Sequence, residues 1–84
     1  MRIHIQLGEL IQDELRLGDE DGNLQLTVAD GATPSQVLEQ IGAINQEKTL
    51  LIIVNGTNVP PSQRDTQQLA EGDKMLVMPP LKGG

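Results

Sequence analysis

The sequence has 84 residues, which fits one domain, and aliphatic residues must form its core because Phe, Tyr and Trp are absent. Its 12 acidic residues outnumber 6 scattered basic ones, a formal net charge of −6 that argues against nucleic acid as a partner and favours basic protein surfaces. The absence of cysteine excludes disulfides, thiolate metal sites and a cysteine nucleophile.

The chain also carries no recognisable targeting or membrane segment. No apolar run reaches the roughly 18 residues that a bilayer span requires, and the first residues, MRIHIQL, alternate instead of forming a signal peptide. We therefore expect a cytoplasmic protein that does not associate with a membrane.

Two stretches of alternating residues predict half-buried strands. In residues 1–7 (MRIHIQL) every odd position is apolar, and residues 23–28 (NLQLTV) repeat this period of two. The segment between them, residues 8–22, allows two interpretations. Leu7, Ile11 and Leu15 would form one stripe of a helix, whereas Leu15 and Leu17 would instead extend a hairpin around the turn at Asp21-Gly22.

Residues 33–42 contain the clearest helix signals in the chain. Thr33 stands at the N-cap position, Pro34 at the first helical position, and Gln36 three residues after the cap, as in a capping box. Val37, Leu38 and Ile41 then form one apolar face, and Gly42 suits the carboxyl-terminal end.

Two later stretches predict further strands. Leu50 to Val54 is a nearly continuous apolar run that ends in the turn pair Asn55-Gly56, and residues 74–78 (KMLVM) are stopped by Pro79 and Pro80. Leu69 is the expected core anchor of the polar connection between them. This order of elements predicts an α+β fold of the β-grasp kind, with a mixed four- to five-stranded sheet covered on one face by one main helix.

The last six residues, PPLKGG, are chemically unlike a core segment. Six extended residues span about 20 Å, and Pro79-Pro80 favours a stiff polyproline geometry that lowers the cost of ordering in a partner's groove. Gly83 and Gly84 lack a Cβ, so they fit a narrow tunnel and expose the terminal carboxylate. We therefore expect a domain over residues 1–78 and an extended tail over residues 79–84.

The sequence resembles a family of bacterial and archaeal ubiquitin-like sulfur carriers, the MoaD and ThiS proteins. The likeness rests on VNG at residues 54–56, Val59-Pro60, LAEGD at residues 69–73, and the PP..GG ending at residues 79–84. The ending is more similar to MoaD, the small subunit of molybdopterin synthase. The resemblance implies a ubiquitin-like β-grasp fold and covers the chain apart from residues 8–22.

The resemblance also implies a carrier that is not itself an enzyme. A MoeB- or ThiF-like adenylating enzyme would use ATP to activate the Gly84 carboxylate, and a persulfide would convert it to a thiocarboxylate. A MoaE-like larger synthase subunit, or another sulfur-accepting enzyme, would then receive the sulfur. Residues expected to insert into these partners are Pro79, Pro80, Leu81, Lys82 and Gly83. The carrier itself would bind no cofactor or metal.

Residues next to the tail are candidates for partner docking. Ubiquitin-like folds often use a face of the sheet, and adaptable methionines suit such surfaces, so Met75, Val77 and Met78 are predicted to contribute. The sequence does not fix which side of this strand faces the helix. His4 is predicted to be a surface residue, and Asp19 to Gly22 a solvated loop, since the loop lacks the glycine and glutamate positions of an EF-hand.

Three other functions are compatible with the sequence. The same thiocarboxylate would serve thiamine or cysteine synthesis as well as molybdopterin synthesis, because the difference lies in the partner. A ubiquitin-like modifier would instead join its Gly84 carboxylate to lysines. A non-catalytic β-grasp interaction domain would not need Gly83-Gly84 at all.

Overall fold

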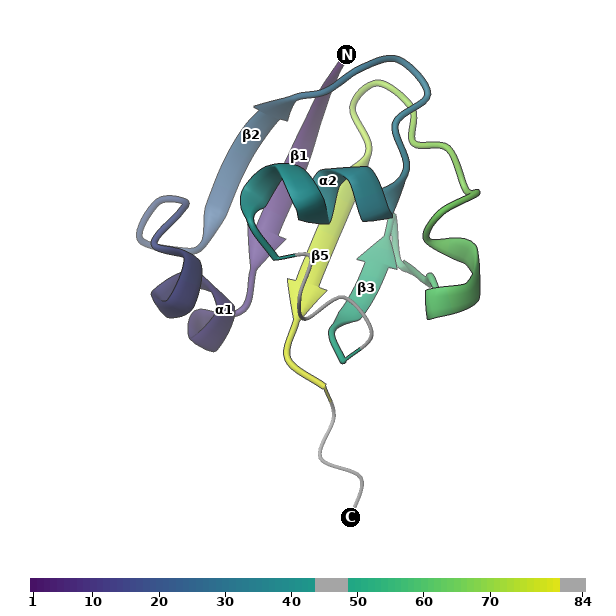
Figure 1. Ribbon diagram of the computed structural model, residues 1–84. Coiled ribbons are helices and arrows are strands. Elements are labelled where there is room, and N and C mark those ends of the chain that lie inside the picture. Colours follow the sequence, from purple (N-terminus) through teal and green to yellow (C-terminus); the bar gives the residue numbers. More distant parts are fainter. Residues whose placement is uncertain (44–48, 81–84) are drawn as a thin grey trace.

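A computed structural model of the chain describes residues 1–43 and 49–80 (Figure 1). These residues form one five-stranded sheet in the order β2-β1-β5-β3-β4. The strands are β1 (Arg2–Leu7), β2 (Asn23–Thr27), β3 (Leu51–Val54), β4 (Thr57–Asn58) and β5 (Lys74–Met78). β1 and β5 run parallel in the middle, and the other neighbouring pairs are antiparallel. The predicted α+β architecture with a mixed sheet is therefore confirmed.

Helix α2 (Pro34–Ile41) crosses one face of the sheet, as Figure 1 shows. Its start is the predicted capping box, because the Thr33 side chain accepts from the Gln36 amide while the Gln36 side chain accepts from the Thr33 amide. It ends at Gly42, whose φ of 88° is left-handed. The apolar face packs Val37 and Leu38 fully into the core. The capping residues at its two ends thus favour this helix independently of its tertiary contacts.

The segment after β1 forms a second, shorter helix, α1 (Glu9–Leu15). Ile11 is buried and Leu15 is half-buried against the core, so the helical interpretation of this stripe is confirmed and the hairpin extended by Leu15 and Leu17 is wrong. The helix ends where Arg16 adopts a left-handed conformation. Neither α1 nor α2, the α-helices of the described residues, is long and apolar enough to cross a membrane.

The core between α2 and the sheet is entirely aliphatic. Ile5, Ile52, Val77 and Leu38 are all completely buried there, and each such side chain contributes about 1.5–3 kcal/mol of transfer free energy. Leu69 is also buried, as predicted. The apolar surface of the sheet's inner face and α2 is what holds the two layers together.

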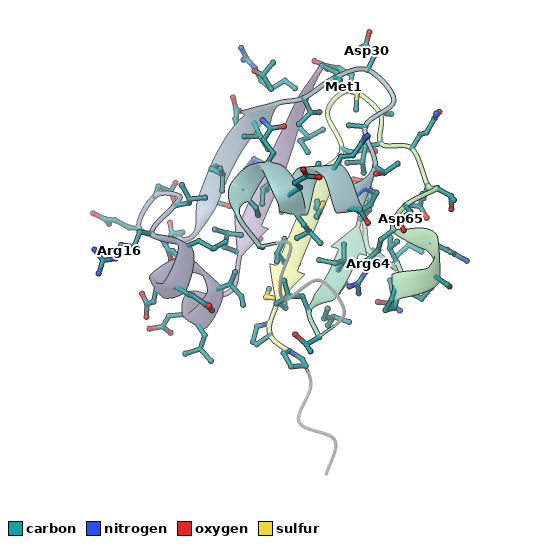
Figure 2. All side chains as sticks on the ribbon, in the orientation of Figure 1. Met1, Arg16, Asp30, Arg64 and Asp65 are labelled. Atoms are coloured by element: carbon teal, nitrogen blue, oxygen red, sulfur yellow. The ribbon has the colours of Figure 1, made fainter. Side chains whose placement is uncertain are left out.

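Arg64 is the one charged side chain buried among the described residues. Its guanidinium donates to the carbonyl oxygens of Val59 (Nε, 3.0 Å) and Leu50 (Nη2, 2.7 Å), and its own carbonyl accepts from the Ser35 amide at 2.9 Å. Figure 2 shows Arg64 between β3 and the short 3₁₀ turn η2 (Pro61–Gln63). It therefore ties the connection before β5 to both β3 and the start of α2.

Two glycines with similar backbone conformations allow a matched test of the α1–β2 segment. Gly22 (φ +82°) and Gly56 (φ +84°) are both left-handed, but a Cβ on Gly22 would overlap the carbonyl oxygen of Leu7, whereas one on Gly56 meets nothing within 4 Å. We expect Gly56→Ala to cost about 1–2 kcal/mol and Gly22→Ala about 1–3 kcal/mol more. Urea unfolding of both variants measures this difference. Equal losses would contradict the close approach of Gly22 to β1.

Candidate docking surface at the root of the tail

Strand β5 carries the chain to the root of the tail. β1 and β5 are parallel, with Leu7 opposite Val77. β5 therefore ends at the end of the sheet that lies away from the amino terminus (Figure 1). Pro79 is half-buried and Pro80 is exposed there. The other predicted tail residues, Leu81, Lys82, Gly83 and Gly84, lie outside the described residues.

The structure corrects part of the predicted docking set. Met75 and Val77 are both 0% exposed and belong to the core beneath α2, so a partner cannot reach them and their prediction as docking residues is wrong. Met78 does lie on the opposite, outer face, where it is half-buried. The inward direction of Met75 and Val77 follows from their register with β1, which aligns Met75 with the buried Ile5.

The outer face of the sheet carries an apolar patch that the sequence did not reveal. Leu51 pairs with Met78 and Ile53 pairs with Leu76, so these four side chains stand together on that face, and all four are half-buried. We call Leu51, Ile53, Leu76 and Met78 the outer patch. Their alternation with buried neighbours is visible in the sequence, but the pairing of β3 with β5 is not.

Polar residues border the outer patch on the β1 side. Gln6 pairs with Leu76 and His4 pairs with Lys74, so both polar side chains share the outer face. His4 is half-buried, and its Nε2 lies 3.1 Å from Oδ1 of Asn23. An apolar centre with a polar rim is the usual composition of a protein-binding surface.

A groove of about 260 Å³ adjoins the outer patch at the tail. It shares Leu51 with the outer patch, and Pro80 forms part of its wall. The buried guanidinium of Arg64 holds the backbone around it through its bonds to Val59 and Leu50. The full lining is Thr49, Leu50, Leu51, Asn58, Pro60, Pro61, Arg64 and Pro80. The root of the tail thus follows directly on the outer patch and forms part of the groove wall.

The acidic loop at Asp19 to Gly22 is organised by its own backbone. The Asp19 carboxylate accepts hydrogen bonds from the amides of Asn23 and Asp21, both at 2.9 Å, and these bonds lower the pKa of Asp19 below its ordinary value of 3.8. In residues 1–43 and 49–80 no three His, Cys, Asp or Glu side chains are grouped so that they could hold a metal ion. Asp19, Glu20 and Asp21 are exposed, as predicted for a solvated loop, whereas Gly22 at its end is buried beside Leu7.

Comparison with known protein families decides what kind of domain this is. The model of the ThiS family matches residues 10–84, which is nearly the whole chain. The chain belongs to the ThiS family. The predicted resemblance to the ThiS and MoaD carriers is thereby confirmed, while the preference for MoaD within that group stays a prediction. No curated protein matches the chain.

Solved structures with the same fold include other ubiquitin-like proteins. SAMP1 from Haloferax volcanii has a TM-score of 0.70 and 16% identity, with 100% of both chains covered. Urm1 from Trypanosoma brucei has a TM-score of 0.64 and 16% identity, covering 99% of this chain and 95% of Urm1. A chain in the complex of subunits 1 and 2 of molybdopterin-converting factor from Helicobacter pylori has a TM-score of 0.54 and 20% identity, with both chains fully covered. At these identities the likeness shows the fold of this ThiS-family chain.

Two methionines of β5 test the assignment of its faces. Met75→Gln places an amide in the core, so we expect it to lower the free energy of unfolding by about 2–5 kcal/mol. Met78→Gln makes the same change on the half-exposed outer face, where we expect a loss below about 1 kcal/mol. Urea unfolding of the two variants gives both values. A larger loss for Met78→Gln would mean that the strand faces the other way.

Proposed function

We propose that this protein is a sulfur carrier whose Gly84 carboxylate is activated by adenylation and converted to a thiocarboxylate. The observation that carries the proposal is the membership of the ThiS family combined with a diglycine at Gly83-Gly84, at the end of the matched residues. The position of the tail supports it, because β5 delivers Pro79 and Pro80 away from the core at one end of the sheet.

The proposed chemistry needs only a carboxylate from this chain. An oxygen of the Gly84 α-carboxylate attacks the α-phosphorus of ATP, pyrophosphate leaves, and an acyl-adenylate forms. A persulfide sulfur on a partner then attacks the acyl carbon, and AMP departs with the electrons of the carbon–oxygen bond. A thiol reduces the resulting acyl disulfide, which frees the thiocarboxylate and leaves a disulfide on the partner. The partners supply the ATP, the sulfur and the reducing thiol.

The absence of side chains at Gly83 and Gly84 matters at both displacement steps. In the first step a Gly84 carboxylate oxygen must lie in line with the departing pyrophosphate at the α-phosphorus, and in the second the persulfide sulfur must reach the acyl carbon, both inside an enzyme that excludes water. A glycine backbone occupies the narrowest channel and lets partner groups approach the carbonyl closely. The stiff Pro79-Pro80 pair holds that backbone away from the domain at a low ordering cost.

The outer patch and the adjoining groove are the proposed contacts with an adenylating enzyme of the MoeB or ThiF kind. They flank the root of the tail, so an enzyme that takes the tail into its active site comes against them. Leu76 and Met78 supply apolar area there without being needed by the inner core. Of the docking residues predicted from the sequence, Met78 is retained. Leu51, Ile53 and Leu76 are added to it as proposed docking residues.

The sulfur acceptor proposed first is a larger synthase subunit of the MoaE kind. The complex of subunits 1 and 2 from Helicobacter pylori contains a chain with this fold, which supports a two-subunit arrangement here. In such a pair the carrier is the non-catalytic subunit, and the expected product pathway is that of molybdopterin. Thiamine or cysteine synthesis would use the same activated tail with a different acceptor.

A second candidate function is that of a ubiquitin-like modifier. The small archaeal modifier protein 1 of Haloferax volcanii shares the fold over the full chain. A modifier would pass the activated Gly84 carbonyl to a lysine amine and form an isopeptide bond, so the adenylation step is common to both functions. Lysine adducts of the protein in cell extract would favour this candidate, and a free thiocarboxylate would favour the carrier.

Substitution of the terminal residue tests the proposal. We expect Gly84→Val to reduce the rate of ATP–pyrophosphate exchange with the adenylating enzyme by about 100-fold, because a branched side chain displaces the carboxylate from its in-line position. Gly84→Ala should lose less than Gly84→Val, and neither variant should change the urea unfolding curve. Normal exchange by Gly84→Val would refute a role for this carboxylate.

A further inference from the structure

The negative charge of the protein is concentrated in one segment. Residues 9–21, which comprise α1 and the following loop, contain six acidic residues and one basic residue, Arg16, which gives a net charge of −5 out of the total of −6. The six acidic residues, all exposed, are Glu9, Asp13, Glu14, Asp19, Glu20 and Asp21. The rest of the chain is therefore close to neutral. A field of one sign at one end of a small domain steers it towards a surface of opposite charge.

An exposed leucine lies within this acidic segment. Leu10 is 68% exposed, and among residues 1–43 and 49–80 it is the one large hydrophobic side chain that stands out in solvent. Asp13 and Glu14 are its neighbours on the helix surface, three and four residues further along α1. The buried side of α1 is supplied by Ile11, so the core does not need Leu10. An apolar side chain bordered by carboxylates is the complement of an apolar recess bordered by cations.

A hollow of about 650 Å³ is lined mostly by residues of the acidic segment. Its lining includes Glu9 and Asp13 of α1, Glu20 and Asp21 of the loop, and Arg16. Figure 2 shows Arg16 projecting away from the domain at the end of α1. Lysine and arginine side chains of a partner would enter this hollow, which Asp13 shares with the surface around Leu10.

The acidic helix is fixed to the root of the tail. Gly8, the residue before α1, donates its amide to the carbonyl oxygen of Val77 at 2.8 Å. A Cβ on Gly8 would lie 3.0 Å from Sδ of Met78 and 3.1 Å from Cδ of Pro79, so the two segments touch. Figure 1 shows α1 at the same end of the sheet as the end of β5. A protein that receives the tail therefore meets α1 as well.

We propose that the exposed face of α1, centred on Leu10 and Asp13, is a docking surface for the adenylating enzyme, which meets it with an apolar recess bordered by lysine or arginine side chains. This proposal rests on the proposed function, and it names a specificity surface separate from the outer patch. An enzyme that holds ATP phosphates gathers positive charge around its active site. This charge would attract the acidic end of the carrier, which is also the end from which the tail leaves. A second copy of this chain is disfavoured, because its own residues 9–21 carry the same net charge of −5.

Three variants of the full chain test the docking surface. Leu10→Gln removes the apolar contact while keeping a good helix former, and Asp13→Lys reverses one charge beside it. Glu39→Lys is the matched control, because it makes the same change of charge at an exposed position of α2. The readout is the KM for the carrier and the kcat in ATP–pyrophosphate exchange, measured with the adenylating enzyme encoded in the same genome.

We expect Leu10→Gln to raise the KM by about tenfold with an unchanged kcat, as for a lost docking contact. Asp13→Lys should raise the KM at low salt, with the effect shrinking as the salt concentration rises, and Glu39→Lys should match the wild type. All three proteins should keep the wild-type unfolding curve.

Three results would overturn the proposal. If Leu10→Gln and Asp13→Lys both match Glu39→Lys in exchange, α1 does not dock on this enzyme, although the proposed function stands. If their effect appears only in sulfur transfer to the acceptor, the surface belongs to that enzyme instead. If the wild type supports no exchange, the proposed function fails together with this inference.

Discussion

The parallel pairing of β1 with β5 is the constraint on which the rest of the structure depends. The two strands are the first and last of the described residues, and they pair inside the sheet, with β2 beside β1 and with β3 and β4 on the β5 side. It also sets the direction of β5, so that Pro79 and Pro80 leave the domain at the end where α1 begins. One set of backbone hydrogen bonds thus determines where the tail starts and what surrounds it.

The two faces of β5 lie in different surroundings, one in the core and one at the surface. Met75 and Val77 pack beneath α2 and hold the layers together, while Leu76 and Met78 stand on the outer face with Leu51 and Ile53. Because both sets belong to one strand, the surface next to the tail is built on a strand whose other face is buried in the core. This arrangement suits the proposed role of presenting one terminal carboxylate to successive enzymes.

Local chemistry explains how much could be predicted from the sequence. The capping box of Thr33 and Gln36 and the period of two in residues 1–7 and 74–78 specify α2 and the strands, and the family resemblance rested on short motifs. The direction of Met75 and Val77 was not readable, because it depends on pairing with β1, about 70 residues earlier. Leu10 was missed since the helix or hairpin question over residues 8–22 stayed open, and a helix of 7 residues is marginal without its tertiary contacts.

Intact-mass spectrometry can show whether Gly84 carries activated sulfur. The protein is incubated with the adenylating enzyme of the same genome, ATP and a sulfide source, and then compared with a sample that lacks ATP. We expect an ATP-dependent gain equal to the mass difference between sulfur and oxygen, located on the carboxyl-terminal peptide. An unchanged mass despite an active enzyme, or a modification elsewhere in the chain, would contradict it.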